Sequence, residues 1–141
     1  MKSLKLKLLL VALLCFGCED FLDCVAGRNP SLPDKSFPVA STSNYYYVDI
    51  SAEIKNEPRD DDYDYFFEID EDHLPDGMDY FINNRIVSFE GQPLETGTFD
   101  IEVFLYVDGP VRVDYDEDGN AYYEDVLCNH STFKTYTLVV Q

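Results

Sequence analysis

Apolar and polar side chains alternate with a period of two along most of this chain, and this alternation limits its fold more than any other feature. Between residues 44 and 55, one side carries Tyr46, Val48, Ile50, Ala52 and Ile54. The pattern recurs at 64–70, at 99–107 and in the last stretch, 132–140. A period of two is typical of half-buried strands, and no segment shows the 3.6-residue period of an amphipathic helix.

Turn residues separate the predicted strands. Residues 79–90 have the pattern of a hairpin turned at Asn83-Asn84, two residues that tolerate a positive φ. Asp108-Gly109-Pro110 form a further turn, which leads into a second hairpin made of residues 111–115 and 121–127. About eight short strands joined by regular turns predict an all-β fold, a β-sandwich.

Three turn motifs follow one another within residues 74–107. Their residues are Leu74, Pro75, Gly77 and Met78, then Ile86, Ser88, Gly91 and Pro93, then Thr96, Gly97, Thr98 and Phe99. This order resembles the immunoglobulin-like domain of bacterial surface proteins, which is related to cadherin-like folds. The resemblance implies an immunoglobulin-like β-sandwich over residues 39–141. In that family the third motif begins a strand that turns directly into the last one, so we interpret residues 108–131 as an inserted β-hairpin before the last strand.

The first residues have the shape of a secretory signal peptide. Lys2, Lys5 and Lys7 precede an apolar run from 8 to 17, which is too short to span a bilayer. Gly17-Cys18 resembles the lipobox of bacterial lipoproteins, although Cys15 stands where leucine is usual. The resemblance implies removal of residues 1–17, acylation of Cys18 and a lipid anchor in the outer membrane. An ordinary signal peptide cut near Gly17 is the alternative.

Residues 18–38 then form a lipidated tether, in which Pro30, Pro33 and Pro38 are expected to prevent regular pairing. Glu19-Asp20 resembles the export signal of surface lipoproteins in the Bacteroidota. Display on the cell surface and attachment facing the periplasm both remain open.

Two cysteines remain after the signal peptide and the acylated Cys18 are set aside. Exported proteins meet an oxidising compartment, so we expect a disulfide between Cys24 and Cys128. It would close a loop of about 100 residues and contribute up to ~4–5 kcal/mol in the chain-entropy model. Two free buried thiols are the alternative.

Acidic residues dominate the charge of the chain. Its net charge is −18, and because residues 1–17 hold three of the ten basic residues and none of the 28 acidic ones, their removal makes it −21. Such a surface repels nucleic acid and anionic lipid headgroups, which excludes a nucleic-acid partner. The 21 tyrosine and phenylalanine residues supply enough apolar surface for a folded core.

One acidic segment has the spacing of a calcium loop. Its candidate ligands are Asp114, Asp116, Asp118, Asn120 and Asp125. EF-hand loops lie between helices, whereas both flanks here look like strands. We therefore favour a plain hairpin with an Asp-Gly turn, and a weak Ca²⁺ site is the alternative.

Aromatic residues also occur at outward positions of the predicted strands. Tyr45, Tyr47 and Phe66 are candidates for an exposed strip that contacts a partner or a carbohydrate. The alternative is that the tether or the inserted hairpin covers them.

The sequence holds no nucleophile elbow, no Cys/His metal spacing and no glycine-rich phosphate loop. We therefore expect a non-enzymatic protein that needs no cofactor, attached to the membrane by its lipid. The expected role is a binding or structural accessory subunit of an outer-membrane or cell-surface assembly, with an envelope protein as its partner. Surface glycan capture or Ca²⁺-assisted adhesion is the alternative.

Overall fold

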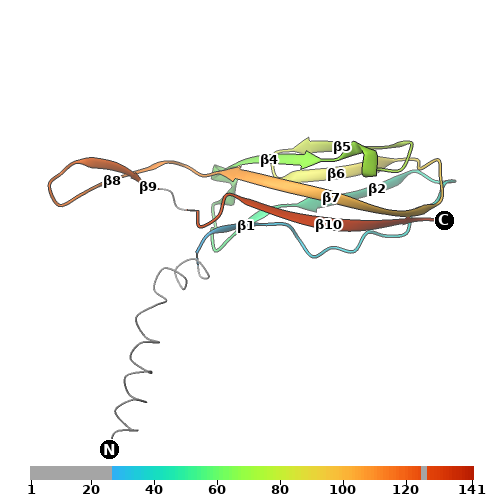
Figure 1. Cartoon of the computed structure of the whole chain (residues 1–141), viewed down its shortest axis with the longest axis horizontal. Helices are drawn as coiled ribbons and strands as arrows, with labels where there is room; N and C mark the ends of the chain where they lie inside the picture. Colours follow the sequence, from blue (N-terminus) through green and yellow to red (C-terminus); the bar gives the residue numbers. More distant parts are fainter. Residues whose placement is uncertain (1–26, 125–126) are drawn as a thin grey trace, which may run out of the picture.

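Two antiparallel three-stranded sheets pack face to face in the computed structural model, which describes residues 27–124 and 127–141 (Figure 1). One sheet has the order β2-β6-β5 and the other β10-β7-β4. The strands of the two sheets are β2 (Tyr46–Ser51), β4 (Asp64–Ile69), β5 (Met78–Asn83), β6 (Ile86–Gly91), β7 (Gly97–Asp108) and β10 (Ser131–Val140). The short β1 (Asn29–Ser31) pairs with β3 (Glu53–Lys55), which directly follows β2.

This strand order is that of an immunoglobulin-like sandwich. β1, β2 with β3, β6 and β5 correspond to strands A, B, E and D, and β4, β7 and β10 correspond to C, F and G. β8 (Arg112–Tyr115) and β9 (Ala121–Glu124) pair only with each other and lie between β7 and β10 in the chain. The predicted inserted hairpin before the last strand is therefore present.

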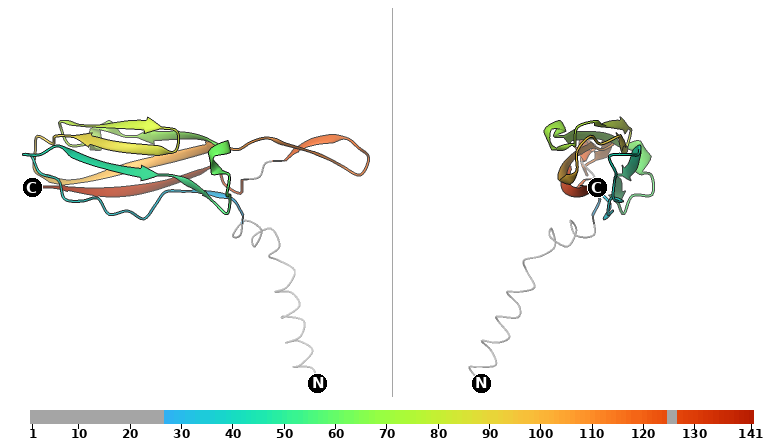
Figure 2. Two further views of the ribbon diagram at one scale, coloured as in Figure 1. Left: turned by 180° about the vertical axis from the view of Figure 1, so that it is seen from behind. Right: turned by 90° about the vertical axis from the view of Figure 1, so that its right-hand side faces the viewer.

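The hairpin extends away from one end of the sandwich, and the C-terminus lies at the other end (Figure 2). Two short 3₁₀ turns, η1 (Asp60–Asp62) and η2 (Glu71–His73), flank β4. In the part of the chain that the structure describes, no helix is long and apolar enough to cross a membrane.

The inward-facing apolar side chains of the alternating strands fill the core between the sheets. Val48 and Ile50 are buried from β2 and Ile54 from β3, and β7 and β10 contribute the inward residues Ile101, Val103, Leu105, Val107, Tyr136, Leu138 and Val140. Burial of each large aliphatic side chain contributes about 1.5–3 kcal/mol. The inward faces predicted for residues 46–54 and for β7 are confirmed.

Two of the turn motifs meet at the end of the sandwich opposite the hairpin. The Gln92 amide donates to the Gly77 carbonyl over 3.1 Å, and the Leu94 amide donates to the Asp76 carbonyl over 2.8 Å. Pro75 and Pro93 are fully buried. The Leu-Pro turn and the Gly-x-Pro turn therefore form a single packed unit.

The prediction that prolines keep residues 19–38 out of regular pairing is wrong for Asn29–Ser31, which form β1. Pro30 lies opposite Ile54, in a strand whose only neighbour within its sheet is β3, so its missing N–H can face away from the pairing. Leu32 is buried, and the Phe37 ring stacks on Tyr136 with centroids 5.0 Å apart. The second half of the predicted tether thus packs on the sandwich.

The first hairpin also turns one residue later than predicted. Asn83 pairs with Ile86, so the loop consists of Asn84 and Arg85, and Asn84 has the positive φ of 53°. The register that buries Val87 and Phe89 sets this position, since a shift of one residue would turn both side chains outward.

Candidate functional site

Four half-exposed aromatic side chains gather on the outer surface of the β4-β7-β10 sheet. Phe66 comes from β4, Phe104 and Tyr106 from β7, and Phe133 from β10. Phe66 is 54% exposed and Phe133 is 65% exposed. We call this set, Phe66, Phe104, Tyr106 and Phe133, the aromatic face.

The strand register brings the four rings together in two cross-strand pairs. Phe66 lies opposite Tyr106 with ring centroids 6.2 Å apart, and Phe104 lies opposite Phe133 with centroids 5.6 Å apart. Tyr106 also stacks on His130 at 5.8 Å, and its hydroxyl donates to Asp108 over 2.9 Å. Ring contacts of this kind contribute about 0.5–1.5 kcal/mol each, and they still leave much of every ring in contact with water.

A shallow groove of about 570 Å³ runs between these rings. Glu68 and Ser131, whose side chains share the outward side of the sheet with the rings, also line it. An apolar floor with a few polar groups beside it is the usual composition of a ligand or partner site.

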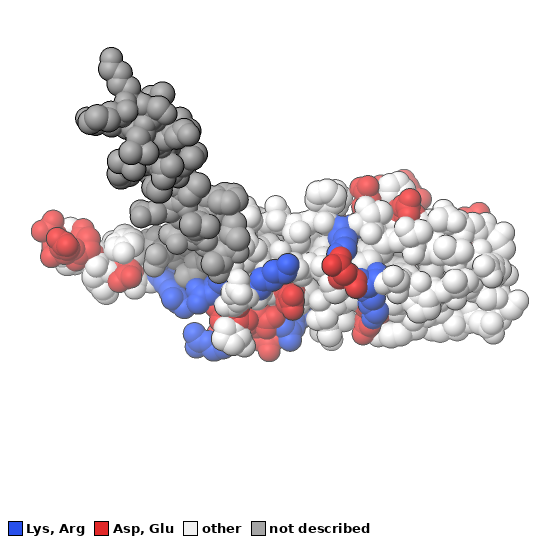
Figure 3. Space-filling model, turned by 90° about the horizontal axis from the view of Figure 1, so that it is seen from below, with Lys and Arg blue, Asp and Glu red and all other residues white. Residues whose placement is uncertain are grey.

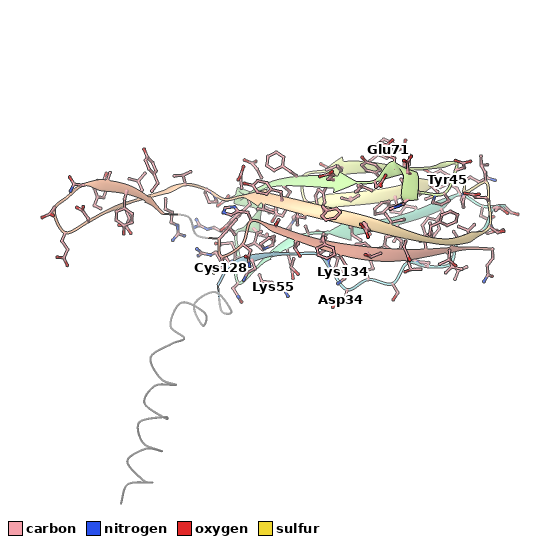
Figure 4. The ribbon with its side chains drawn as sticks, in the orientation of Figure 1. Asp34, Tyr45, Lys55, Glu71, Cys128 and Lys134 are labelled. Atoms are coloured by element: carbon pink, nitrogen blue, oxygen red, sulfur yellow. The ribbon has the colours of Figure 1, made fainter. Side chains whose placement is uncertain are left out.

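The predicted strip of Tyr45, Tyr47 and Phe66 is divided between the two sheets. Tyr45 and Tyr47 are exposed on the outer side of the β2-β6-β5 sheet, and Phe66 belongs to the opposite side of the sandwich. The Tyr47 hydroxyl lies 3.3 Å from that of Ser88. Desolvation and a hydrogen bond with Glu90 raise the pKa of Tyr45, whose position Figure 4 marks. The three residues therefore do not form one strip.

Sequence reasoning missed Phe104, Tyr106 and Phe133, although the signal was present. Phe104 and Tyr106 lie on the outward side of β7, the same side that carries Asp100 and Glu102 earlier in the strand. Aromatic residues at positions that otherwise carry carboxylates indicate an outward apolar surface. Phe133 joins them only through the pairing of β7 with β10.

The predicted calcium loop is organised by its own hydrogen bonds. The Asp116 carboxylate accepts from the amides of Asp118 at 3.0 Å and Asn120 at 2.7 Å, and from the Asn120 side chain at 3.0 Å. The Asn120 side chain and these amides lower the pKa of Asp116. Of the predicted ligands, Asp125 lies outside the described residues. Asp114, Asp116, Asp118 and Asn120 lie on the hairpin and its turn.

Because Asp125 is not among the described residues, the choice between the plain hairpin and the calcium loop stays a prediction. Within residues 27–124 and 127–141, no three Asp, Glu, His or Cys side chains are grouped so that they could hold a metal ion.

Cys128 lies at the root of the hairpin, where Figure 4 labels it. Its backbone amide donates to the Arg28 carbonyl over 3.0 Å, and the neighbouring Leu127 forms a parallel bridge with Arg28. Cys18 and Cys24 lie outside the described residues, so the Cys24–Cys128 pairing stays a prediction.

Polar contacts fasten the segment that precedes β2 to β10. Asp34 and Lys134 form an ion pair, and the two side chains lie side by side in Figure 4. The Tyr136 hydroxyl donates to the Pro33 carbonyl over 2.9 Å. These contacts hold the edge of β10, the strand that carries Phe133.

No protein-family model matches the chain, and no curated protein matches it.

Proposed function

We propose that this protein is a non-enzymatic binding module of the bacterial envelope, an accessory subunit of an outer-membrane or cell-surface assembly. The aromatic face is the observation that carries this proposal. Rings such as Phe104 and Phe133 cost free energy while they face water and gain it when a partner covers them. Their support is a sheet with a well-packed core, so they present a preorganised surface.

Attachment to the outer membrane is part of the proposal. The lipobox-like ending at Cys18 supports acylation there, and the strand order supports kinship with immunoglobulin-like domains of bacterial surface proteins. A Cys18→Ser variant tests the anchor. It should move from the membrane fraction to the soluble fraction of the envelope, and a variant that stays in the membrane would refute the anchor.

The partner that fits the aromatic face best is another envelope protein. Glu68 is the charged side chain that lines the groove, and the chain carries a net charge of −18. An acidic ligand would be repelled, whereas an apolar protein surface bordered by basic residues would be attracted.

A second candidate function is the capture of a neutral glycan. The groove places the Glu68 and Ser131 side chains beside exposed rings, and sugar rings can stack on such rings while their hydroxyls bind the polar groups. The groove supports this candidate, and the presence of four exposed rings on one side of the sheet favours the protein partner.

Affinity purification from detergent-solubilised envelope separates the two candidates. Recovery of one outer-membrane protein in a fixed ratio to the acylated chain is the result expected for a subunit. If no protein is recovered and the purified chain binds a neutral glycan on an array, the glycan candidate replaces the subunit proposal. Failure of both measurements would refute a binding role for the aromatic face.

A further inference from the structure

The β8–β9 hairpin, residues 112–124, which we call the arm, contributes no described side chain to the core of the sandwich. Every described side chain from Val111 to Tyr123 is exposed, and the arm extends beyond the end of the sandwich in both ribbon views (Figures 1 and 2). A two-stranded hairpin alone in water is at best marginally stable. An arm of this kind gains stability when a second surface covers it.

The register gives the arm two different faces. Val113 lies opposite Tyr123 and Tyr115 lies opposite Ala121, so these four residues share one side. Arg112, Asp114 and Tyr122 occupy the other side. We call the first side the apolar face of the arm. Tyr123 on it is 77% exposed, and its neighbour Tyr122 on the opposite side is 46% exposed.

The root of the arm contacts the segment that leads into β1. Leu127 bridges Arg28, and the side-chain amide of Asn129 donates to that of Asn29 over 3.1 Å. Nine residues separate the predicted lipid-bearing Cys18 from Arg28. The ten steps from Cys18 to Arg28, at about 3.3–3.6 Å each, limit the root of the arm to within about 36 Å of the membrane surface.

The charges of the arm restrict what can cover it at that height. Asp114, Asp116, Glu117 and Asp118 lie on or beside its tip, and Figure 3 shows acidic side chains gathered at this far end. This charge opposes contact with anionic lipid headgroups, and it opposes the equally acidic arm of a second copy. A protein surface that has an apolar strip with basic residues beside it would attract the acidic tip instead of repelling it.

We propose that the apolar face of the arm docks on the exposed part of an integral protein of the same membrane, close to the headgroups. The inference rests on the proposed lipid anchor, because the anchor sets the height of the arm. The arm is a second contact site, separate from the aromatic face, and it would orient the sandwich against its partner. Its partner bears an apolar strip for Val113 and Tyr123 and lysine or arginine residues for the acidic tip.

Photo-crosslinking from adjacent positions tests this docking in intact envelopes of the native cell. A benzophenone amino acid replaces Tyr123 in one full-length variant and Tyr122 in a matched control, and both positions are exposed, so neither change disturbs the core. We expect an adduct from position 123 in at least tenfold higher yield than from position 122. The captured protein should remain in the membrane pellet after an alkaline carbonate wash of cells that lack this chain.

Four results would overturn the docking proposal: equal yields from the two positions, an adduct of two copies of this chain, an adduct to lipid, or no adduct at all. The Cys18→Ser change is then added to the position-123 variant. Loss of the adduct together with release from the membrane supports both proposals. If the chain is released from the membrane but the adduct is undiminished, only the dependence of the docking on the anchor is refuted. If the chain stays in the membrane, the proposed anchor is refuted and the docking proposal is unaffected.

Discussion

Gly77 and Gly91 hold the two turn motifs together, and neither position has room for a side chain. Gly77 has a φ of +85°, and a Cβ there would lie 2.3 Å from the Gln92 carbonyl oxygen. Gly91 has a φ of +144°, and a Cβ there would lie 2.2 Å from the Gly77 carbonyl oxygen. Each obstacle is backbone, which cannot move aside as a flexible side chain would.

We therefore predict that Gly77→Ala lowers the free energy of unfolding by about 2–4 kcal/mol, from left-handed strain and overpacking together. Gly119→Ala is the matched control, because Gly119 has a similar φ of +82° but no atom within 4 Å of an added Cβ. Its cost should be about 1 kcal/mol or less. Urea unfolding measures both, and equal losses would contradict the packing account.

Three buried tyrosines make the stability sensitive to alkaline pH. Burial raises the pKa of Tyr46, Tyr65 and Tyr136 to about 12 each, from an ordinary value of 10. Below pH 10 these groups are neutral in both the folded and the unfolded chain, so stability is fully retained. Between pH 10 and 12 the unfolded chain ionises first, and stability should fall by about 1–3 kcal/mol per tyrosine.

Urea midpoints measured from pH 8 to 11.5 check this expectation, together with tyrosinate absorbance. Tyr136→Phe should reduce the alkaline loss, because that side chain then cannot ionise. A midpoint that stays constant up to pH 11.5 would contradict the burial of these hydroxyls.

At the scale of elements, the segment before β2 belongs to the folded sandwich. The Phe37 ring lies 5.0 Å from that of Tyr136 and 5.5 Å from that of Phe89. Truncation by Phe37→Ala should cost about 2 kcal/mol of unfolding free energy. Val39→Ala, at an exposed position two residues later, should change it by less than about 0.5 kcal/mol. Thermal unfolding of both variants decides this, and an unaffected Phe37→Ala variant would show that the segment is only loosely attached.

The arm should be dispensable for folding. Replacement of residues 112–124 by an Asn-Gly turn removes only exposed side chains among those described, so the unfolding free energy of the sandwich should change by less than about 1 kcal/mol. Urea unfolding of the shortened chain measures the change. A loss of several kcal/mol would mean that the arm supports the core.

The sequence was sufficient to predict the strands, because burial between two sheets imposes the alternation of residues such as Ile101 and Val103. It was not sufficient for β1, since three residues with a central proline pair only because β3 offers an edge. The aromatic face depends on which strands become neighbours. Phe104 and Phe133 are 29 positions apart in the chain, and only the β7–β10 register joins them.

At the scale of the whole molecule, the domain combines a strongly acidic surface with two exposed apolar areas. Charge of one sign keeps copies apart and favours partners with basic residues. We propose that the aromatic face and the apolar face of the arm are the areas that a partner covers. In this proposal, the aromatic face of the β4-β7-β10 sheet is the principal contact with the rest of an envelope assembly.

The most direct test compares three chains in the same purification from solubilised envelope. Phe104→Ser with Phe133→Ser removes two rings of the aromatic face, and Tyr45→Ser with Tyr47→Ser removes two comparably exposed rings from the opposite sheet. Loss of a central aromatic pair typically costs 2 kcal/mol or more of binding free energy, so partner recovery should fall at least about tenfold for the first variant. The second variant should recover the partner like the unaltered chain. Equal recovery by all three chains would contradict the account.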